Sequence, residues 1–212
     1  MSWQSTYCSM DNNPIKYNDP KGDKIIIRNQ WKDDKGNIHE KKVLYKKGKL
    51  YDLNGKLYIP EKGGYFEKVQ NDLNLLKSDG ERSKNVVNQL DNSKNTHIIS
   101  NHVYERPKDE NIGNYNLNFK DNNTITKYDA FSNFNIAQEK RNPRVGLIHE
   151  LTHAWDYDKD FKWKFEESNK VGGVKLSEIH AVNVENTIRK VTGDPKRIRY
   201  SGVLIPNSYL NK

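Results

Sequence analysis

The spacing of apolar residues changes along the chain, and this change limits the fold more than any other feature of the sequence. Residues 24–60 alternate apolar with polar side chains, and the turn signals KKGK and LNGK separate the alternating stretches. Residues 64–80 and 81–93 instead carry apolar side chains at helical spacing. Two strand-like stretches follow, and the second predicts a hairpin that turns at Asn122 and Asn123. This order predicts an α+β fold with N-terminal β-hairpins, then a small sheet, then helices.

Two more helices are expected in the C-terminal third of the chain. Asn142 is suited to cap the first, Pro143 suits its first turn, and its apolar residues continue to about Tyr157. We expect Ser177 to cap the second helix and Gly193 to end it. The residues with metal-binding or catalytic chemistry lie mainly on these two helices.

The composition is typical of one folded domain with a modest core. Only 33% of the residues are apolar, but 10% are aromatic, which argues against a disordered chain. We expect a domain over residues 24–212, with a β-rich part over 24–62, and a short separate segment over 1–23. The net charge of +8 comes from basic residues that are scattered among acids, so it favours a solvated surface over a nucleic-acid-binding groove.

Several protein classes are excluded by simple counts. Cys8 is the single cysteine, so the chain has no internal disulfide and no cysteine-based zinc knuckle. No apolar run approaches the roughly 18 residues of a membrane-spanning helix. The N-terminus also lacks the basic and apolar regions of a secretory signal. We therefore expect a soluble protein which, if it leaves its cell, is delivered without a signal peptide.

The sequence HELTH, residues 149–153, places two imidazoles one helical turn apart. Side chains four residues apart share a helix face, with Cβ atoms about 5–6 Å apart, so His149 and His153 can bind one ion. Zinc binds imidazole nitrogen at about 2.0–2.1 Å. The adjacent Glu150 would then lie beside the ion, where it can take a proton from a water molecule. The pattern therefore predicts one zinc per chain, with Glu150 as the catalytic residue.

A catalytic zinc needs a third protein ligand and one open position. Glu178 lies in the first turn of the last helix on its apolar side, and an inward carboxylate there needs a charge partner such as a metal. The other interpretation of Glu178 is an acid that suits the helix dipole. Asp156 and Asp158 are alternative ligands, although Asp156 is rotated by about 60° from the second imidazole. His97 and His180 are expected to be structural or surface residues.

Residues further along the last helix and beyond it extend this site. Glu185 lies on the same inward face and either orients a ligand histidine or forms an ion pair with Arg189 or Arg199. Peptide hydrolysis also needs a donor for the developing oxyanion. Tyr200 is our candidate donor, and Arg199 is a second residue that can reach the site from beyond the helix.

Two stretches, RVGLIHELTHAWDYD and LSEIHAVNVENTIRKVTGDPKRIRYSG, add patterns beyond HELTH. These are E-x-x-A-V-x-x-E-N and G-x-P-x-R-x-x-Y. With them, residues 90–205 resemble the zinc metallopeptidase family of secreted bacterial effectors, whose best-known members cut mitogen-activated protein kinases inside host cells. The resemblance implies a zincin-like fold with Glu150 as the catalytic residue. It also implies the zinc ligands His149, His153 and Glu178.

The stretch YCSMDNNPIKYNDPKGD near the N-terminus is similar to the end of an Rhs core, whose pattern is N-N-P-I-x-x-x-D-P-x-G. In polymorphic toxins of this type a variable toxin domain follows the core. Residues 1–23 would then be a stub of the core, and residues 24–212 the toxin domain. Almost the whole Rhs shell is absent, so the resemblance supports a toxin or effector without indicating one delivery route.

The leading hypothesis is a zinc endopeptidase of effector or toxin type, which cleaves a protein in a host or competitor cell. An immunity protein is the expected second partner of a toxin, and neither a membrane nor a nucleic acid is expected. One alternative is a non-catalytic binding module stabilised by zinc, in which a protein side chain fills the fourth coordination position. The other is a basic nuclease toxin that binds nucleic acid at physiological salt.

Overall fold

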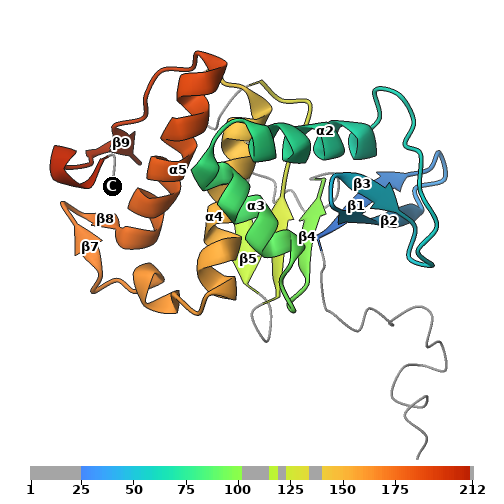
Figure 1. Cartoon of the computed structure of the whole chain (residues 1–212), viewed down its shortest axis with the longest axis horizontal. Coiled ribbons are helices and arrows are strands. Elements are labelled where there is room, and N and C mark those ends of the chain that lie inside the picture. Colours follow the sequence, from blue (N-terminus) through green and yellow to red (C-terminus); the bar gives the residue numbers. More distant parts are fainter. Residues whose placement is uncertain (1–24, 102–114, 119–122, 134–139, 211–212) are drawn as a thin grey trace, which may run out of the picture.

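The computed structural model describes residues 25–101, 115–118, 123–133 and 140–210, which form the predicted α+β fold (Figure 1). Within these ranges there is one six-stranded mixed sheet, with the strand order β3-β2-β1-β4-β6-β5. Its strands are β1 (Ile25–Lys32), β2 (Ile38–Lys46), β3 (Lys49–Tyr51), β4 (His97–Ser100), β5 (Tyr115–Asn118) and β6 (Thr124–Lys127). The Rhs-like segment over residues 1–23 lies outside the described residues.

The N-terminal strands form the expected antiparallel meander. β1 pairs with β2, and β2 pairs with β3 through the predicted KKGK turn. Lys47 and Gly48 occupy that turn with φ angles of 49° and 84°, a region that favours glycine. Alternate side chains such as Ile27 and Val43 are fully buried, so one face of the meander packs on the core.

The predicted hairpins and the small sheet that follows them are parts of one sheet, because β1 joins them. β1 pairs in parallel with β4, and β4 pairs in parallel with β6. The three consecutive isoleucines, Ile25 to Ile27, suit an internal strand, which is covered by neighbours on both edges. β5 pairs antiparallel with β6 and forms one edge of the sheet.

Four α-helices lie in the described ranges, and the predicted pair at residues 64–93 is confirmed. The helices are α2 (Tyr65–Ser78), α3 (Glu81–Asp91), α4 (Pro143–Asp158) and α5 (Leu176–Thr192). α2 packs on α3 and β1, and α4 contacts α3, α5, β5 and β6. Figure 1 shows α4 and α5 side by side. Their apolar side chains form one large core with β1 and β2.

α4 is the central helix, and it is buried on all sides over residues 145–154 rather than along one apolar stripe. The predicted cap is confirmed, because the Asn142 side chain accepts a hydrogen bond from the backbone N–H of Arg144 at 3.2 Å. Such a cap contributes about 1 kcal/mol to helix stability. Because the helix is enclosed, each of its polar side chains needs a partner inside the protein.

The start of α5 differs from the prediction. Lys175, and not Ser177, is the N-cap residue, and it makes no side-chain capping bond. The short strand β8 (Val174–Lys175) leads directly into the helix, so Ser177 lies in the first turn, fully buried. The predicted end is confirmed, because Gly193 adopts a φ of 75° as the C-cap.

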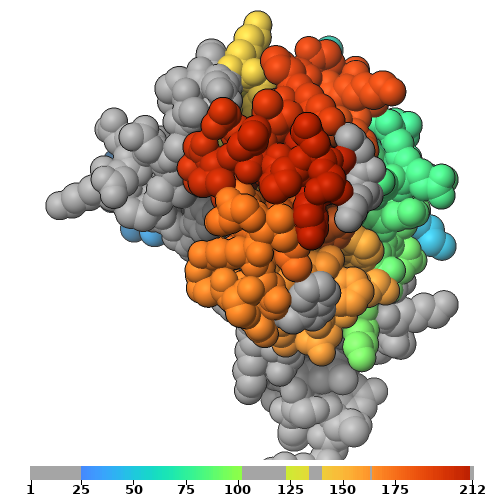
Figure 2. Space-filling view, turned by 90° about the vertical axis from the view of Figure 1, so that its left-hand side faces the viewer, coloured from blue at the N-terminus to red at the C-terminus, as the bar shows by residue number. Residues whose placement is uncertain are grey.

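Several short segments lie around α5, which also contributes to a second, smaller apolar cluster. They comprise the 3-10 helices η3 (Lys162–Phe165) and η4 (Asn207–Tyr209) and the strands β7 (Lys170–Val171), β9 (Arg199–Tyr200) and β10 (Val203–Leu204). Figure 2 shows residues 160–175 beside the C-terminal residues on one face. The cluster consists of Val174, Ile179, Val182, Ile205 and Leu210. Among the described helices, none combines the length and the apolarity needed to cross a membrane.

Candidate metal centre

α4 holds the two HELTH imidazoles against each other inside the protein. The ring centroids of His149 and His153 are 5.0 Å apart, with an angle of 86° between the ring planes. The two histidines are only 5% and 7% exposed. The helical spacing therefore brings both rings to one place, as the sequence predicted.

Glu178 meets these two imidazoles from the first turn of α5. Its Oε2 atom lies 3.2 Å from Nε2 of His149 and 3.2 Å from Nε2 of His153. The three ligand atoms all lie within 4.8 Å of one another. Because α4 packs directly on α5, two helices fix all three side chains.

The donor set fits a zinc ion. Two imidazole nitrogens and one carboxylate oxygen are the ligands of many catalytic zinc sites, and at bonds of about 2.0–2.1 Å neighbouring tetrahedral donors lie roughly 3.3 Å apart. The two 3.2 Å separations agree with this spacing. Glu178 retains 19% of its side-chain exposure, so the site is not sealed on that side.

Glu185 fixes the orientation of His149 through the ring nitrogen that does not face Glu178. Its Oε2 atom lies 2.9 Å from Nδ1 of His149, and the side chain is fully buried. When Nδ1–H donates to this carboxylate, the Nε2 lone pair is directed at the Glu178 side. Both interpretations that the sequence left open for Glu185 are present together, since Arg189 Nε also donates to its Oε1 at 2.6 Å.

Of the two arginines offered as partners of Glu185, Arg189 is the one found, and a second arginine, Arg197, joins it. Arg197 donates from a terminal nitrogen to Glu185 Oε2 at 3.0 Å. Arg199 is exposed and donates to the carbonyl of Gly202 instead. Burial raises the pKa of Glu185, but its hydrogen bond with His149 and the arginine charges outweigh burial and leave the pKa well below its usual range.

Hydrogen bonds between the two imidazoles and the acids shift the pKa values of both kinds of group. Burial would lower the pKa of His149, but hydrogen bonds with Glu178 and Glu185 raise it to about 9. Burial also opposes ionisation of Glu178, yet hydrogen bonds with His149 and His153 bring its pKa far below the ordinary value. Carboxylates that hold their charge around two imidazoles favour a bound cation.

Glu150 lies beside these ligands on α4 and is 8% exposed. Burial raises the pKa of its carboxyl group, and the neighbouring His149 and His153 only partly offset this effect. A carboxyl group with a raised pKa exchanges protons more readily near neutral pH than an ordinary glutamate.

Tyr200 reaches the same place from β9. Its ring stacks on His149, with centroids 6.0 Å apart and ring planes 3° apart. Burial, the charge of Glu178 and a hydrogen bond with Glu178 raise the pKa of its hydroxyl well above the usual value. The hydroxyl therefore stays protonated at neutral pH and is a hydrogen-bond donor next to the centre.

Two residues, Asn186 and Arg197, help to position Tyr200, and this role was not predicted from the sequence. Asn186 donates from Nδ2 to the carbonyl of Arg197 at 2.8 Å and accepts from the Arg197 backbone N–H at 2.7 Å. The Arg197 guanidinium lies 4.9 Å from the centroid of the Tyr200 ring. Both residues belong to the patterns that follow HELTH, but the patterns alone do not indicate that they contact each other.

The alternative ligands Asp156 and Asp158 are engaged elsewhere. Asp156 is fully buried and accepts a hydrogen bond from Lys164 Nζ at 2.7 Å. His180 Nδ1 lies 2.9 Å from the same carboxylate. Asp158 accepts from Asn95 Nδ2 at 2.8 Å and from the Ser93 hydroxyl. Neither belongs to the group of convergent ligand atoms found among the described residues.

His97 and His180 lie outside the metal centre. His97 is buried, with Nδ1 2.9 Å from Thr124 Oγ1 and Nε2 3.3 Å from Asp158. His180 pairs with Asp156 and packs against Trp155, with ring centroids 5.2 Å apart. Both histidines therefore connect secondary-structure elements.

Phe165 was also missed in the sequence. Its ring lies 5.5 Å from the ring of His153 and stacks on Tyr157 at 4.4 Å. It comes from η3, so this short helix covers the His153 side of the centre. The sequence between α4 and α5 has no periodicity that indicates this contact.

Comparison with known proteins adds one result. Residues 53–196 match the family model Peptidase_M91, whose description is effector protein. The match spans more than half of the chain and includes all of α4 and α5, while Tyr200 lies just outside it. No curated protein and no solved structure matches the chain.

Proposed function

Since the chain belongs to the Peptidase_M91 family of effector proteins, we propose that it is a zinc-dependent endopeptidase that cleaves a protein substrate in a target cell. The observation that carries this proposal is the approach of two imidazole nitrogens to one carboxylate oxygen, each at 3.2 Å. His149, His153 and Glu178 would hold the zinc. Three protein ligands leave a fourth position for water or substrate, as a catalytic site requires.

A bound zinc supplies two kinds of chemistry, polarisation of the substrate carbonyl and a lowered pKa for water. Glu150 then acts as the general base, takes a proton from the attacking water and passes it to the leaving amine. Its buried position and raised pKa support both proton transfers, because a group that must gain and lose a proton works best with a pKa near the working pH.

Tyr200 is the proposed donor to the developing oxyanion. Its hydroxyl is held beside the centre by stacking on His149 and by Arg197. Because its pKa is raised, it donates a hydrogen bond without losing its proton. A fixed donor of this kind typically contributes about 10²–10³ in rate.

The edge strand β5 is a suitable place for an extended substrate. It forms one edge of the sheet and contacts α4, the helix that bears HELTH. An edge strand offers unpaired backbone groups, so a peptide can add to it as a further strand. This arrangement supports a zincin-like fold and a protein substrate over a small molecule.

Delivery to another cell is part of the proposal because the family consists of effectors. In the toxin form of the hypothesis, residues 1–23 are the remainder of an Rhs core and residues 24–212 are the delivered domain. An immunity protein would then protect the producing cell. Co-expression of the toxin with candidate immunity proteins tests this hypothesis, because an immunity protein should restore the growth of cells that make the toxin.

Glu150→Gln tests the mechanism. The variant keeps the shape of the side chain but cannot accept the proton, so we expect about a 10³-fold loss of activity on a generic protein substrate such as casein, with zinc retained. Glu61→Gln, at an exposed position far from the site in sequence, is the matched control. Chelation should abolish the activity of the wild-type protein.

Full activity in Glu150→Gln would show that the mechanism is wrong, and loss of zinc would show that Glu150 is a ligand instead. A fourth protein ligand in a crystal structure of the zinc-loaded protein would favour the non-catalytic binding module.

A further inference from the structure

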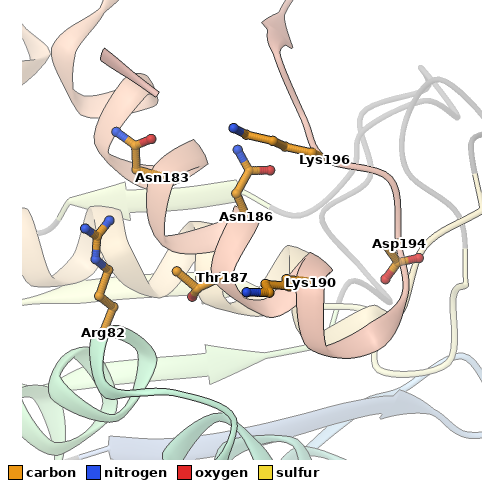
Figure 3. Close-up of a pocket in the computed structure, with 7 residues that line it drawn as sticks. All are labelled: Arg82, Asn183, Asn186, Thr187, Lys190, Asp194 and Lys196. Carbon is orange, nitrogen blue, oxygen red and sulfur yellow. The ribbon is translucent and has the colours of Figure 1, made fainter. Parts of the chain in front are cut away.

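A groove with a volume of about 550 Å³ lies between α5, α3 and the loop after α5 (Figure 3). This volume is within the range of about 300–1,000 Å³ that small-molecule sites have. None of the candidate ligands His149, His153 and Glu178 lines the groove, and Thr187 in its wall lies about 180° around α5 from Glu178 at 100° per residue.

The groove is rich in cations. Figure 3 shows Arg82 extending from α3 toward α5, Lys190 on α5, and Lys196 on the loop beyond the helix. These three basic residues come from three different parts of the chain. Arg82 and Lys190 are both exposed, and neither makes an ion pair or a hydrogen bond with any described residue.

Asp194 is the single acid among the lining residues that the structure describes. Its Oδ2 atom accepts hydrogen bonds from the Thr192 hydroxyl at 2.5 Å and from the Asn142 backbone N–H at 3.1 Å. This carboxylate is therefore fixed at the junction of α4 and α5, and it offsets only one of the three basic groups. The groove keeps a net positive charge.

The remaining lining is polar and held in place. Asn183 donates to the carbonyl of Tyr209 at 2.7 Å, and Asn186 is held by Arg197. The Thr187 hydroxyl donates to the Val184 carbonyl at 2.7 Å. The wall is thus preformed, and only the long basic side chains need to become ordered when a ligand binds.

We propose that this groove binds a small anion that carries two or more phosphate groups. A guanidinium and two ammonium groups around one hollow suit several phosphates, since charge-assisted hydrogen bonds to phosphate are the strongest that these side chains make. A single phosphate would contact only some of these three basic groups. The phosphates can belong to a soluble metabolite or to a lipid headgroup, which share this chemistry.

The test uses the full chain as purified and two probes. Fructose 1,6-bisphosphate is titrated at 0.15 M salt and followed by backbone amide chemical shifts. Vesicles with phosphatidylinositol 4,5-bisphosphate are tested separately by sedimentation. We expect saturable binding with shifts confined to residues near 82, 187–190 and 196, and inorganic phosphate should bind about tenfold more weakly or worse.

The double variant Arg82→Ala/Lys190→Ala should weaken binding by about tenfold or more. The matched control is Lys32→Ala/Lys56→Ala, which removes the same charge at exposed positions of the β1–β3 region and should leave binding unchanged. Binding of the sugar bisphosphate assigns the site to a soluble anion, and binding of vesicles alone assigns it to a headgroup.

Absence of saturable binding to both probes, or equal weakening in both double variants, would overturn the proposal. These measurements do not depend on peptidase activity, so they test the anion site independently of the proposed function. The metal content of every protein is measured before and after titration, because phosphate compounds bind metals.

Discussion

Two clusters of histidines and acids lie along α4, and they differ in how their charges are arranged. The metal centre consists of His149, His153, Glu178 and Glu185. The other, which we call the distal cluster, consists of Asp156, Asp158, His97, His180 and Lys164. In the distal cluster each acid has its own donors, such as Lys164 on Asp156 at 2.7 Å. In the metal centre two imidazoles share one oxygen of Glu178.

This difference shows that residue type alone does not define a metal site. Both clusters are largely buried, and both contain the side chains that bind zinc. The distal cluster distributes its contacts over separate atoms and so connects α4 to its neighbours. The metal centre directs two imidazole nitrogens and one carboxylate oxygen at one point, an arrangement that suits a divalent cation.

Beside the metal centre, a change at Tyr200 is expected to act on catalysis. Tyr200→Phe keeps the ring that stacks on His149 but removes the hydroxyl, so kcat should fall by about 10²-fold with little change in KM. Tyr58→Phe in the N-terminal region is the control. Unchanged kcat in Tyr200→Phe would mean that the oxyanion is stabilised by another group.

A smaller effect is expected at the residue that orients a ligand. Glu185→Gln keeps the volume but weakens the acceptor for His149 Nδ1–H, so zinc affinity should fall by about 10–100-fold. Competition with a chromogenic chelator measures this change. Equal affinity in variant and wild type would show that Glu185 only anchors Arg189 and Arg197.

The distal cluster should respond in stability alone. Asp158→Asn removes a charged acceptor for Ser93, Asn95 and His97, so the free energy of unfolding should fall by about 1–3 kcal/mol, with zinc affinity unchanged. Urea unfolding of the metal-free proteins measures the change in the free energy of unfolding. A loss of zinc affinity in this variant would break the distinction between the two clusters.

The same variant also tests a pH dependence. Burial raises the pKa of Asp158, but hydrogen bonds with His97, Ser93 and Asn95 lower it below its ordinary value. A lowered folded-state pKa means that the carboxylate stabilises the protein above the unfolded pKa of about 3.9, and that this contribution is lost as the pH falls below that value. Between about pH 5 and pH 3, Asp158→Asn should therefore lose less stability than the wild-type protein does.

Much of the metal centre could be predicted because its geometry is local. HELTH fixes His149 and His153 through helical spacing alone, and Asn142 and Pro143 mark the start of that helix. Glu178 could be predicted because the inward face of α5 is visible in its apolar residues. The helices and the β-hairpins followed from periodicity in the same way.

The rest depends on contacts between distant parts of the chain. The chain after Gly193 has no periodicity, so the choice of Arg197 over Arg199 as partner of Glu185 could not be read from it. Ser177 has the chemistry of a cap, but β8 runs directly into α5 and the helix already begins at Leu176. The single sheet needs β1 to pair with β4, about 70 residues along the chain.

The most direct test of the central claim is the zinc content of Glu178→Gln and Asp158→Asn, each measured beside the wild type after extensive dialysis. Convergence of His149, His153 and Glu178 on one ion predicts one zinc per chain in the wild type and in Asp158→Asn, and far less than one in Glu178→Gln. Full zinc in a folded Glu178→Gln, or its loss from a folded Asp158→Asn, would contradict this account.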